Sequence, residues 1–283
     1  MVSGFFARRW KDLLAVGQTT SGKIGLILTT GLVLLAIIGP YIVPYQAGQI
    51  VGAPYSPPSP RFLLGTDDLG EDILSQLIVA CRGSVLVALA AGFVSTSIGV
   101  TLGLFAGYYG GKPSEGVMRA TDAVLVLPLL PLLIVVAAYV PQSIFTVIVV
   151  IGLLSWPATA RTIYSQTLTL KARPFVDISR ISGMSDIEIM FKVLLPNEIS
   201  LAIAYGVFAA VNAVVVEAGL DFIGLGSIQN FSWGIMLYFA LSRNAMLRGM
   251  WQWFLPPGIM IALLGTGLIL VGYSVEKAAR IRT

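Results

Sequence analysis

The chain has 283 residues, of which 56% are hydrophobic and 11% are charged, with 18 lysines and arginines against 14 aspartates and glutamates. A soluble domain carries about 25% charged residues, so this composition excludes a water-soluble globule, and one cysteine excludes a disulfide framework. The absence of histidine argues against a soft-metal site, and the net charge of +4 indicates membrane topology rather than nucleic-acid binding.

Charge-free stretches long enough to cross a membrane recur along the whole chain. A helix needs roughly 20 apolar residues to cross the ~30 Å hydrocarbon core of a bilayer. The sequence therefore predicts an all-α polytopic membrane protein with about six transmembrane helices. We expect these spans near 24–44, 84–108, 119–139, 143–162, 199–219 and 255–275. The stretch 222–242 is rich in glycine, serine and amide residues, which favours a re-entrant or surface helix over a seventh span.

Lysine and arginine are unevenly divided between the two sides of these spans. Fourteen lie on the side of the termini and four on the other side. Positive residues stay in the cytoplasm, so we expect a multi-pass protein of the cell membrane with both termini cytoplasmic. The predicted regions are a cytoplasmic N-terminal segment (1–23), a first span (24–44), an extracytoplasmic segment (45–83), a membrane core (84–275) and a cytoplasmic tail (276–283).

Residues 17–23 have the glycine and lysine spacing of a phosphate-binding P-loop. Ile24 stands where a serine or threonine would bind magnesium, and a membrane span follows at once. We therefore expect no nucleotide site and no cofactor in this chain.

The predicted extracytoplasmic segment contains a proline-rich tether followed by an acidic cluster. The carboxylates of this cluster belong to Asp67, Asp68, Glu71 and Asp72. Alternating carboxylates resemble a calcium loop, but the full pattern of such a loop is absent. A capped helix start, with aspartate at the positive end of the helix dipole, is the favoured interpretation.

Three glycines recur every four residues in the second predicted span, namely Gly99, Gly103 and Gly107. This spacing places them on one helix face, where the lack of side chains lets a second backbone approach closely. We expect this face to pack against a neighbouring helix.

Three ionisable residues fall at membrane depth. Asp122 lies near the inner end of the third predicted span, and Glu217 and Asp221 lie near the outer end of the fifth. Such groups mark a transport pathway or a structural contact, and their position near span ends leaves both roles open.

The longest predicted cytoplasmic segment, 161–198, has the pattern of two short amphipathic helices. Pro174 begins the first helix, Asp177 and Arg180 pair along it, and Gly183 ends it. Its apolar stripe consists of Phe175, Ile178 and Ile181.

Ser185 and Glu188 form the capping box of the second helix, and Pro196 is expected to end it. Its apolar face consists of Ile187, Met190, Phe191 and Leu194. Either the lipid interface or a groove on a cytoplasmic partner would bury the stripes of both helices, and the pattern does not choose between them.

This segment resembles the permease subunits of ABC importers for dipeptides, oligopeptides and nickel, in particular the shorter, C-type partner of their heterodimeric pair. The cytoplasmic signature of that family is a Glu-Ala-Ala segment, a glycine and a terminal Leu-Pro-Asn. The corresponding residues here are Asp177-Ile178-Ser179-Arg180, Gly183 and Leu195-Pro196-Asn197. Other segments match in the family's order, namely Leu64-Gly65-Thr66-Asp67, Gly107-Tyr108-Tyr109-Gly110-Gly111, Met118-Arg119 with Asp122, Glu217-Ala218-Gly219-Leu220 and Ser232-Trp233-Gly234. Departures are Glu71 and Gln76 at two usual arginine positions and Asp221 at a usual serine.

The resemblance implies a type I ABC importer transmembrane domain with its permease core at 84–275 and coupling helices at about 174–192, which would dock into an ATPase subunit. The residues that it assigns to this coupling are Asp177, Arg180, Gly183, Ser185, Ile187, Glu188, Phe191 and Pro196. The implied partners are a second homologous permease, two ATP-binding subunits that also bind the magnesium, an extracytoplasmic solute-binding protein and the lipid bilayer, with no nucleic acid. The chain itself would catalyse nothing, and peptides are the expected cargo, with nickel or oligosaccharides as alternatives.

Two other functions fit parts of the pattern. Asp122, Glu217 and the broken stretch 222–242 would suit a self-sufficient secondary transporter or channel. The glycine face and the lack of catalytic residues would suit a structural subunit of another membrane complex.

Overall fold

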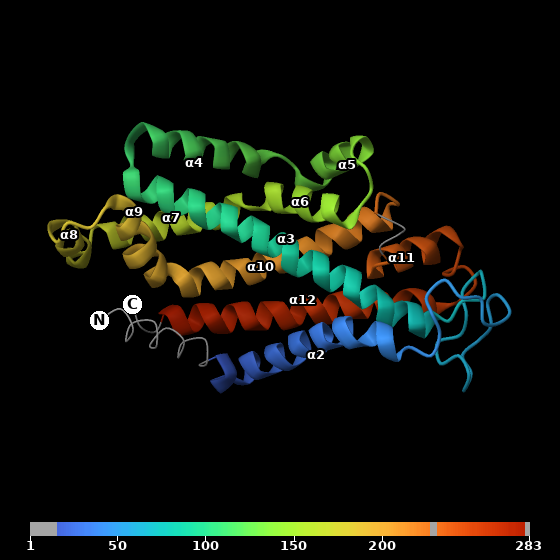
Figure 1. Ribbon diagram of the computed structural model, residues 1–283. Coiled ribbons are helices and arrows are strands. Elements are labelled where there is room, and N and C mark those ends of the chain that lie inside the picture. Colours follow the sequence, from blue (N-terminus) through green and yellow to red (C-terminus); the bar gives the residue numbers. More distant parts are fainter. Residues whose placement is uncertain (1–15, 227–230, 281–283) are drawn as a thin grey trace.

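The computed structural model describes residues 16–226 and 231–280, which form an elongated bundle of helices (Figure 1). The longest connection between the described helices is the segment 43–72, which joins α2 to α3 at one end of the bundle. In chain order the helices are η1 (Val16–Gln18), α2 (Thr20–Ile42), α3 (Ile73–Tyr109), α4 (Gly111–Val126), α5 (Leu129–Tyr139), α6 (Ile144–Ser155), α7 (Pro157–Lys171), α8 (Pro174–Ile181), α9 (Asp186–Glu188), the π-helix η2 (Ile189–Leu194), α10 (Leu195–Phe222), α11 (Trp233–Ser242) and α12 (Trp251–Arg280).

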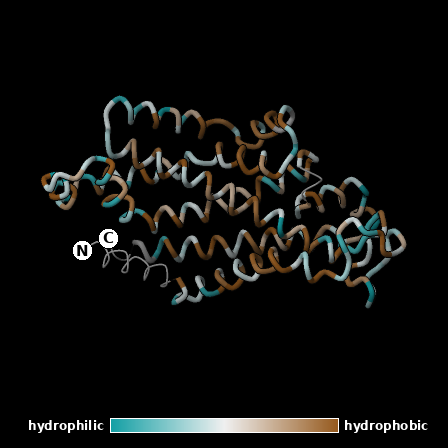
Figure 2. The backbone as a smooth tube through the Cα atoms, in the orientation of Figure 1, coloured by the Kyte–Doolittle hydropathy of each residue, from teal (hydrophilic) through white to brown (hydrophobic). Residues whose placement is uncertain are grey.

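The described residues contain four to six candidate membrane spans. Four continuous helices, within Thr20–Ile42, Ile73–Tyr109, Asp186–Phe222 and Trp251–Lys277, are long and apolar enough to cross alone. Two more crossings arise if α4 with α5, and α6 with α7, each count as one bent span. Hydrophilic residues gather at the two ends of the bundle and hydrophobic residues line its length (Figure 2). The expected all-α membrane fold is confirmed.

The third predicted span, 119–139, falls on two helices, α4 and α5, that are not collinear. α4 ends at Val126, and α5 continues at 87° to it after a short break. Leu127 at the break has an extended backbone, with φ −70° and ψ 131°. It precedes Pro128, whose ring disfavours a helical conformation of the residue before it. The fourth predicted span, 143–162, is likewise bent, by 41° between α6 and α7, where Pro157 begins α7.

α3 is the central helix and begins well before the predicted span 84–108. It packs against α2, α4, α6, α7, α10, α11 and α12. Its 37 residues correspond to a length of about 55 Å, which exceeds the thickness of the hydrocarbon core. Its first turns therefore lie within the segment 45–83 that the sequence assigned to the extracytoplasmic side.

α11 is too short to cross a bilayer, because its 10 residues correspond to about 15 Å. Its N-terminus is buried against α3: the Trp233 N–H donates to Ser84 Oγ at 3.2 Å and the Trp233 indole N–H donates to the Leu77 carbonyl at 3.1 Å. Trp233 has no exposed surface. These contacts fit the expected re-entrant or surface helix rather than a seventh span.

Candidate functional site

α8 and α9 project from the end of the bundle opposite to the segment 43–72 (Figure 1). We call these two ends of the molecule the α8 end and the loop end. Pro174 occupies the first turn of α8, where its fixed φ suits a helix start, and Val176 is fully buried beneath the helix. Gly183 has φ +80°, and its N–H donates to the Arg180 carbonyl at 3.0 Å, while the Met184 N–H donates to the Ser179 carbonyl at 3.2 Å. This Schellman motif ends α8 where the sequence predicted.

The turn that follows begins with the predicted capping box. Ser185 Oγ accepts from the Glu188 N–H at 3.3 Å, and Glu188 Oε2 accepts from the Ser185 N–H at 3.1 Å. Lys192 Nζ donates to Glu188 Oε1 at 2.7 Å. The capping box and this ion pair fix the direction in which the chain re-enters the bundle.

The expectation that Pro196 ends this helix is wrong. The π-helix Ile189–Leu194 leads without interruption into α10, and Pro196 lies buried in the first turn of α10. A proline inside an α-helix clashes with the carbonyl four residues earlier, and the wider π turn relieves that clash. Asn197 Nδ2 donates to the Val193 carbonyl at 2.7 Å, so this carbonyl has a side-chain donor.

Three isoleucines from α8 and α9 remain exposed at the α8 end. The exposed fractions are 63% for Ile178, 86% for Ile181 and 63% for Ile187. We call this set the docking surface. Asp177 and Arg180 pair beside it at 4.0 Å, and both side chains are more than half exposed. An apolar patch rimmed by charges is typical of a surface that binds another protein or lies against a membrane.

Two residues assigned to the same function lie elsewhere. Pro196 is buried in α10, and Phe191 lines a groove between α3 and α10. Gly183 and the capping-box residues Ser185 and Glu188 shape the segment that carries the docking surface. The structure thus brings together six of the eight residues that the resemblance implied.

The groove between α3 and α10 has a volume of about 510 Å³ and a mainly apolar lining. Its hydroxyl groups come from Thr96, Ser97 and Thr101 on α3. Sequence reasoning did not single out these residues. The available signal was the four-residue spacing of Phe93, Ser97 and Thr101, which places them on one face of a span.

The glycine face of α3 lies against α7. A Cβ atom added to Gly103 would lie 2.5 Å from the Ala160 carbonyl oxygen. At Gly99 and Gly107 the added atom would meet Thr159 Cβ and Thr167 Cβ, each at 2.6 Å. The two helices therefore approach to a distance that no larger residue permits at these positions.

Asp122 lies on the surface of α4 and forms an ion pair with Arg161 of α7. Both side chains are about half exposed to solvent or lipid. This pair ties α4 to α7 at a place where the two helices contact each other. The position fits a structural contact better than a buried transport pathway.

Glu217 and Asp221 are buried together in α10, each with 3% of its surface exposed. Ser232 Oγ donates to Asp221 Oδ2 and accepts from the Ile235 N–H at 3.1 Å, so Asp221 supports the N-terminal cap of α11. A Cβ on Gly234 would lie 2.6 Å from Asp221 Cβ, which shows how closely α11 approaches. Neither acid lines the groove described above, and the contacts of Asp221 are those of helix packing.

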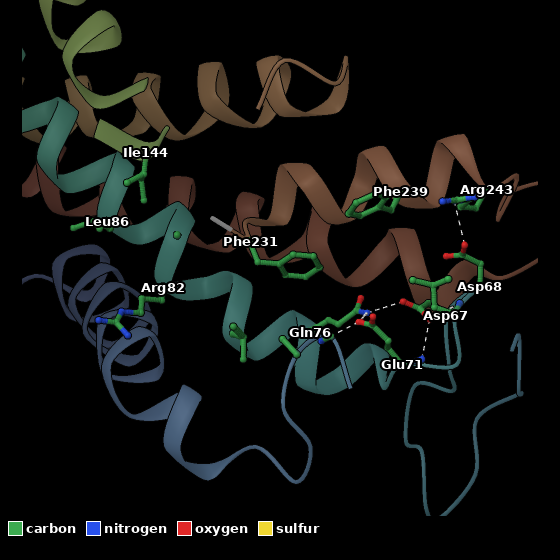
Figure 3. A pocket seen from close by; sticks show the side chains of 15 residues that line it. Asp67, Asp68, Glu71, Gln76, Arg82, Leu86, Ile144, Phe231, Phe239 and Arg243 are labelled. Atoms are coloured by element: carbon green, nitrogen blue, oxygen red, sulfur yellow. Dashed lines mark hydrogen bonds and ion pairs between the residues drawn. The ribbon is translucent and has the colours of Figure 1, made fainter. Parts of the chain in front are cut away.

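A cavity of about 670 Å³ opens at the loop end between α3, α11 and the segment before α3 (Figure 3). Phe231 and Phe239 form part of its apolar wall. Gln76 Nε2 donates to Asp67 Oδ2 at 2.6 Å and to Glu71 Oε2 at 2.8 Å. Glu71 and Gln76, which stand where the family that the sequence resembles usually has arginines, thus contact each other.

Asp67 organises the turn that precedes α3. Its Oδ1 accepts from the N–H groups of Leu69 and Glu71, each at 2.9 Å. Burial raises the pKa of the Asp67 carboxyl above its usual value, although these N–H groups and Gln76 favour the ionised form and partly offset the rise.

The other carboxylates of the acidic cluster are also held by protein donors. Asp72 caps α3 by accepting from the Ser75 N–H at 2.9 Å, and Asp68 pairs with Arg243 at 3.1 Å. Within residues 16–226 and 231–280, no group of three histidine, cysteine, aspartate or glutamate side chains could hold a metal ion. The cluster is a capped helix start, as the favoured interpretation had it.

Comparisons with known proteins agree with this architecture. The family model described as "binding-protein-dependent transport system inner membrane component" matches residues 99–280. A putative peptide permease protein of Brucella suis is 35% identical over 256 residues, which cover 89% of this chain and 84% of that protein. An oligopeptide transport system permease protein of Lactococcus lactis is 33% identical over 77% of this chain and 74% of its own length. A di/tripeptide transport system permease protein of Pseudomonas aeruginosa is 32% identical over 90% and 86%, respectively.

Proposed function

Since the chain belongs to the binding-protein-dependent transport inner membrane components and is a permease subunit of an ABC importer, we propose that its cargo is a di- or oligopeptide. The relatives at 32–35% identity are named as peptide, oligopeptide or di/tripeptide permeases, and this supports the proposal. In this family the ATPase is a separate subunit, so the chain has no catalytic activity of its own. Because the family is driven by ATP, its membership argues against the alternative function of a self-sufficient secondary transporter or channel.

The proposed complex contains a second homologous permease, two ATP-binding subunits and an extracytoplasmic solute-binding protein. The α8 end faces the cytoplasm in this proposal, and both termini lie on that side. The observation that carries it is the docking surface, because three exposed isoleucines rimmed by charges at one end of the bundle match the coupling helices that the family docks into an ATPase. The surplus of lysine and arginine expected on that side supports the same orientation.

Membership of this family implies a sequence of steps for the proposed complex. ATP binding closes the two ATPase subunits and moves the docked α8 and α9 toward the centre of the complex. The paired permeases then open outward and receive the peptide from the binding protein. Hydrolysis resets the bundle, and the groove between α3 and α10, with its hydroxyl groups, is the face that we assign to the path along the second permease.

The experiment places a charge on the docking surface. Ile181→Asp should abolish co-purification of the ATPase subunits, because a carboxylate in an apolar groove loses its hydration without gaining a partner. Leu247→Asp is the matched control, since Leu247 is 87% exposed and Ile181 is 86% exposed, but Leu247 precedes α12 at the loop end. Retention of the ATPases by Ile181→Asp, or their equal loss in Leu247→Asp, would refute docking at this surface.

A further inference from the structure

At the α8 end of the molecule, α3 ends with two adjacent tyrosines that have different surroundings. Tyr108 is 3% exposed, whereas Tyr109 is 42% exposed. The ring of Tyr108 belongs to an apolar cluster with Leu104, Ile163 and Val176, which come from α3, α7 and α8. These apolar contacts account for the ring of Tyr108, whereas its hydroxyl group has separate polar partners.

The hydroxyl of Tyr108 contacts both α8 and α9, the two short helices that carry the docking surface and that we call the docking segment. It donates to Asp186 Oδ1 at 2.5 Å, and Arg180 Nη2 lies 3.5 Å from it. Asp186 is the first residue of α9, and Arg180 is in the last turn of α8. One oxygen atom of α3 therefore joins a carboxylate and a guanidinium that are carried by different helices.

α7 also contacts Tyr108, through the side chain of Lys171. Lys171, the last residue of α7, donates from Nζ to the Tyr108 backbone carbonyl. The same ammonium lies 5.5 Å from the centre of the Tyr108 ring, within the range of a cation–π contact. The tyrosine is thus held between α7 and the docking segment.

α3 connects this point to the opposite end of the molecule without a break. It runs from the cap at Asp72 to Tyr109 as one helix of about 55 Å. Along the way it supplies Ser97 and Thr101 to the groove and Gln76 to the cavity at the loop end. Because α3 is unbroken, it offers a direct connection from Tyr108 to side chains in both hollows.

We propose that the Tyr108 hydroxyl, bound to Asp186 and Arg180, is the link through which movement of the docking segment is passed to α3. This inference rests on the proposed docking of an ATPase at α8 and α9. Tyr108 is a positioning residue, because in this proposal it acts through α3 and not directly on the solute or the nucleotide. A phenylalanine would preserve the buried ring and remove only the two polar contacts, so the hydroxyl can be tested separately from the packing.

The experiment uses the complete importer in proteoliposomes and measures peptide molecules transported per ATP hydrolysed. Tyr108→Phe should lower this ratio about fivefold or more, in the range of a coupling free energy between two sites. Tyr109→Phe removes a hydroxyl from the neighbouring residue and should leave the ratio unchanged. Asp186→Ala removes one of the two contacts and should also lower the ratio, whereas Asp186→Asn keeps an acceptor oxygen and should recover most of it.

Two further readouts separate a link from a general loss of stability. The double variant Tyr108→Phe with Asp186→Ala should be no worse than Tyr108→Phe alone, since Tyr108→Phe already removes the contact with Asp186. The thermal midpoint of each purified complex shows whether it remains folded. An unchanged ratio in Tyr108→Phe, or additive losses in the double variant, would overturn the link alone. Failure of the wild-type chain to bind ATPase subunits would overturn the proposed docking and the link together.

Discussion

Replacing Gly103 by alanine should destabilise the bundle, although alanine favours helix more than glycine does. The new Cβ atom would lie 2.5 Å from the Ala160 carbonyl oxygen and 2.9 Å from Ile163 Cβ. The Ala160 carbonyl belongs to the backbone of α7 and cannot rotate away as a side chain can, so α3 and α7 must move apart. Overpacking of this kind lowers the free energy of unfolding by about 1–3 kcal/mol, whereas the higher helix propensity of alanine raises it by about 1 kcal/mol.

Gly116 on α4 provides the control, because an added Cβ there meets nothing within 4 Å. Gly116→Ala should gain the helix propensity without the clash, so the two variants should differ by about 1–3 kcal/mol in the free energy of unfolding. Reversible denaturant unfolding of the purified protein in detergent micelles measures this difference. Equal stabilisation by the two substitutions would refute the close approach of α3 and α7.

Two further predictions concern the loop end. Asp72→Ala should cost about 1 kcal/mol of stability through loss of the α3 cap, whereas Asp72→Asn keeps an acceptor and should cost much less; equal losses in denaturant unfolding would contradict the cap. Burial raises the pKa of Asp67, so the folded state binds this proton more tightly than the unfolded state does. The free energy of unfolding should therefore fall as the pH rises from 3.8, the ordinary pKa of the carboxyl in the unfolded chain, through the higher pKa of the folded state. Gln76→Leu removes a donor to the ionised carboxylate and should raise this pKa further, which infrared titration of the labelled carboxyl measures; a lowered pKa would contradict the assigned hydrogen bond.

The sequence was most informative where local chemistry decides structure. Pro174, Gly183 and the pair Ser185 and Glu188 mark helix ends through φ restriction, positive φ and side-chain capping, and each acts within a few residues. The membrane class followed from composition, since a chain with 11% charged residues cannot cover a soluble surface. These features need no knowledge of distant contacts.

The structure differs from the predictions where one local sequence signal is compatible with two different structures. Pro128 breaks a span and Pro196 does not, because a π turn precedes Pro196 and an extended residue precedes Pro128. The predicted span 84–108 is shorter than α3 because charge-free stretches report the membrane and not the helix, whose start at Ile73 only the acidic cluster indicated. The contact of Tyr108 with Asp186 joins residues 78 positions apart, and no periodicity or capping pattern reports such a pair.

The most direct test of the proposed function is a cross-link between the docking surface and an ATPase subunit. Cys81 is buried and is the only cysteine in the sequence, so Ile181→Cys introduces a thiol that a bifunctional reagent can reach selectively. We expect this variant, assembled with its partners in the membrane, to cross-link to the ATP-binding subunit, while Leu247→Cys at the loop end does not. An ATPase subunit captured from Leu247→Cys, or none captured from Ile181→Cys in a complex that transports, would contradict the assignment.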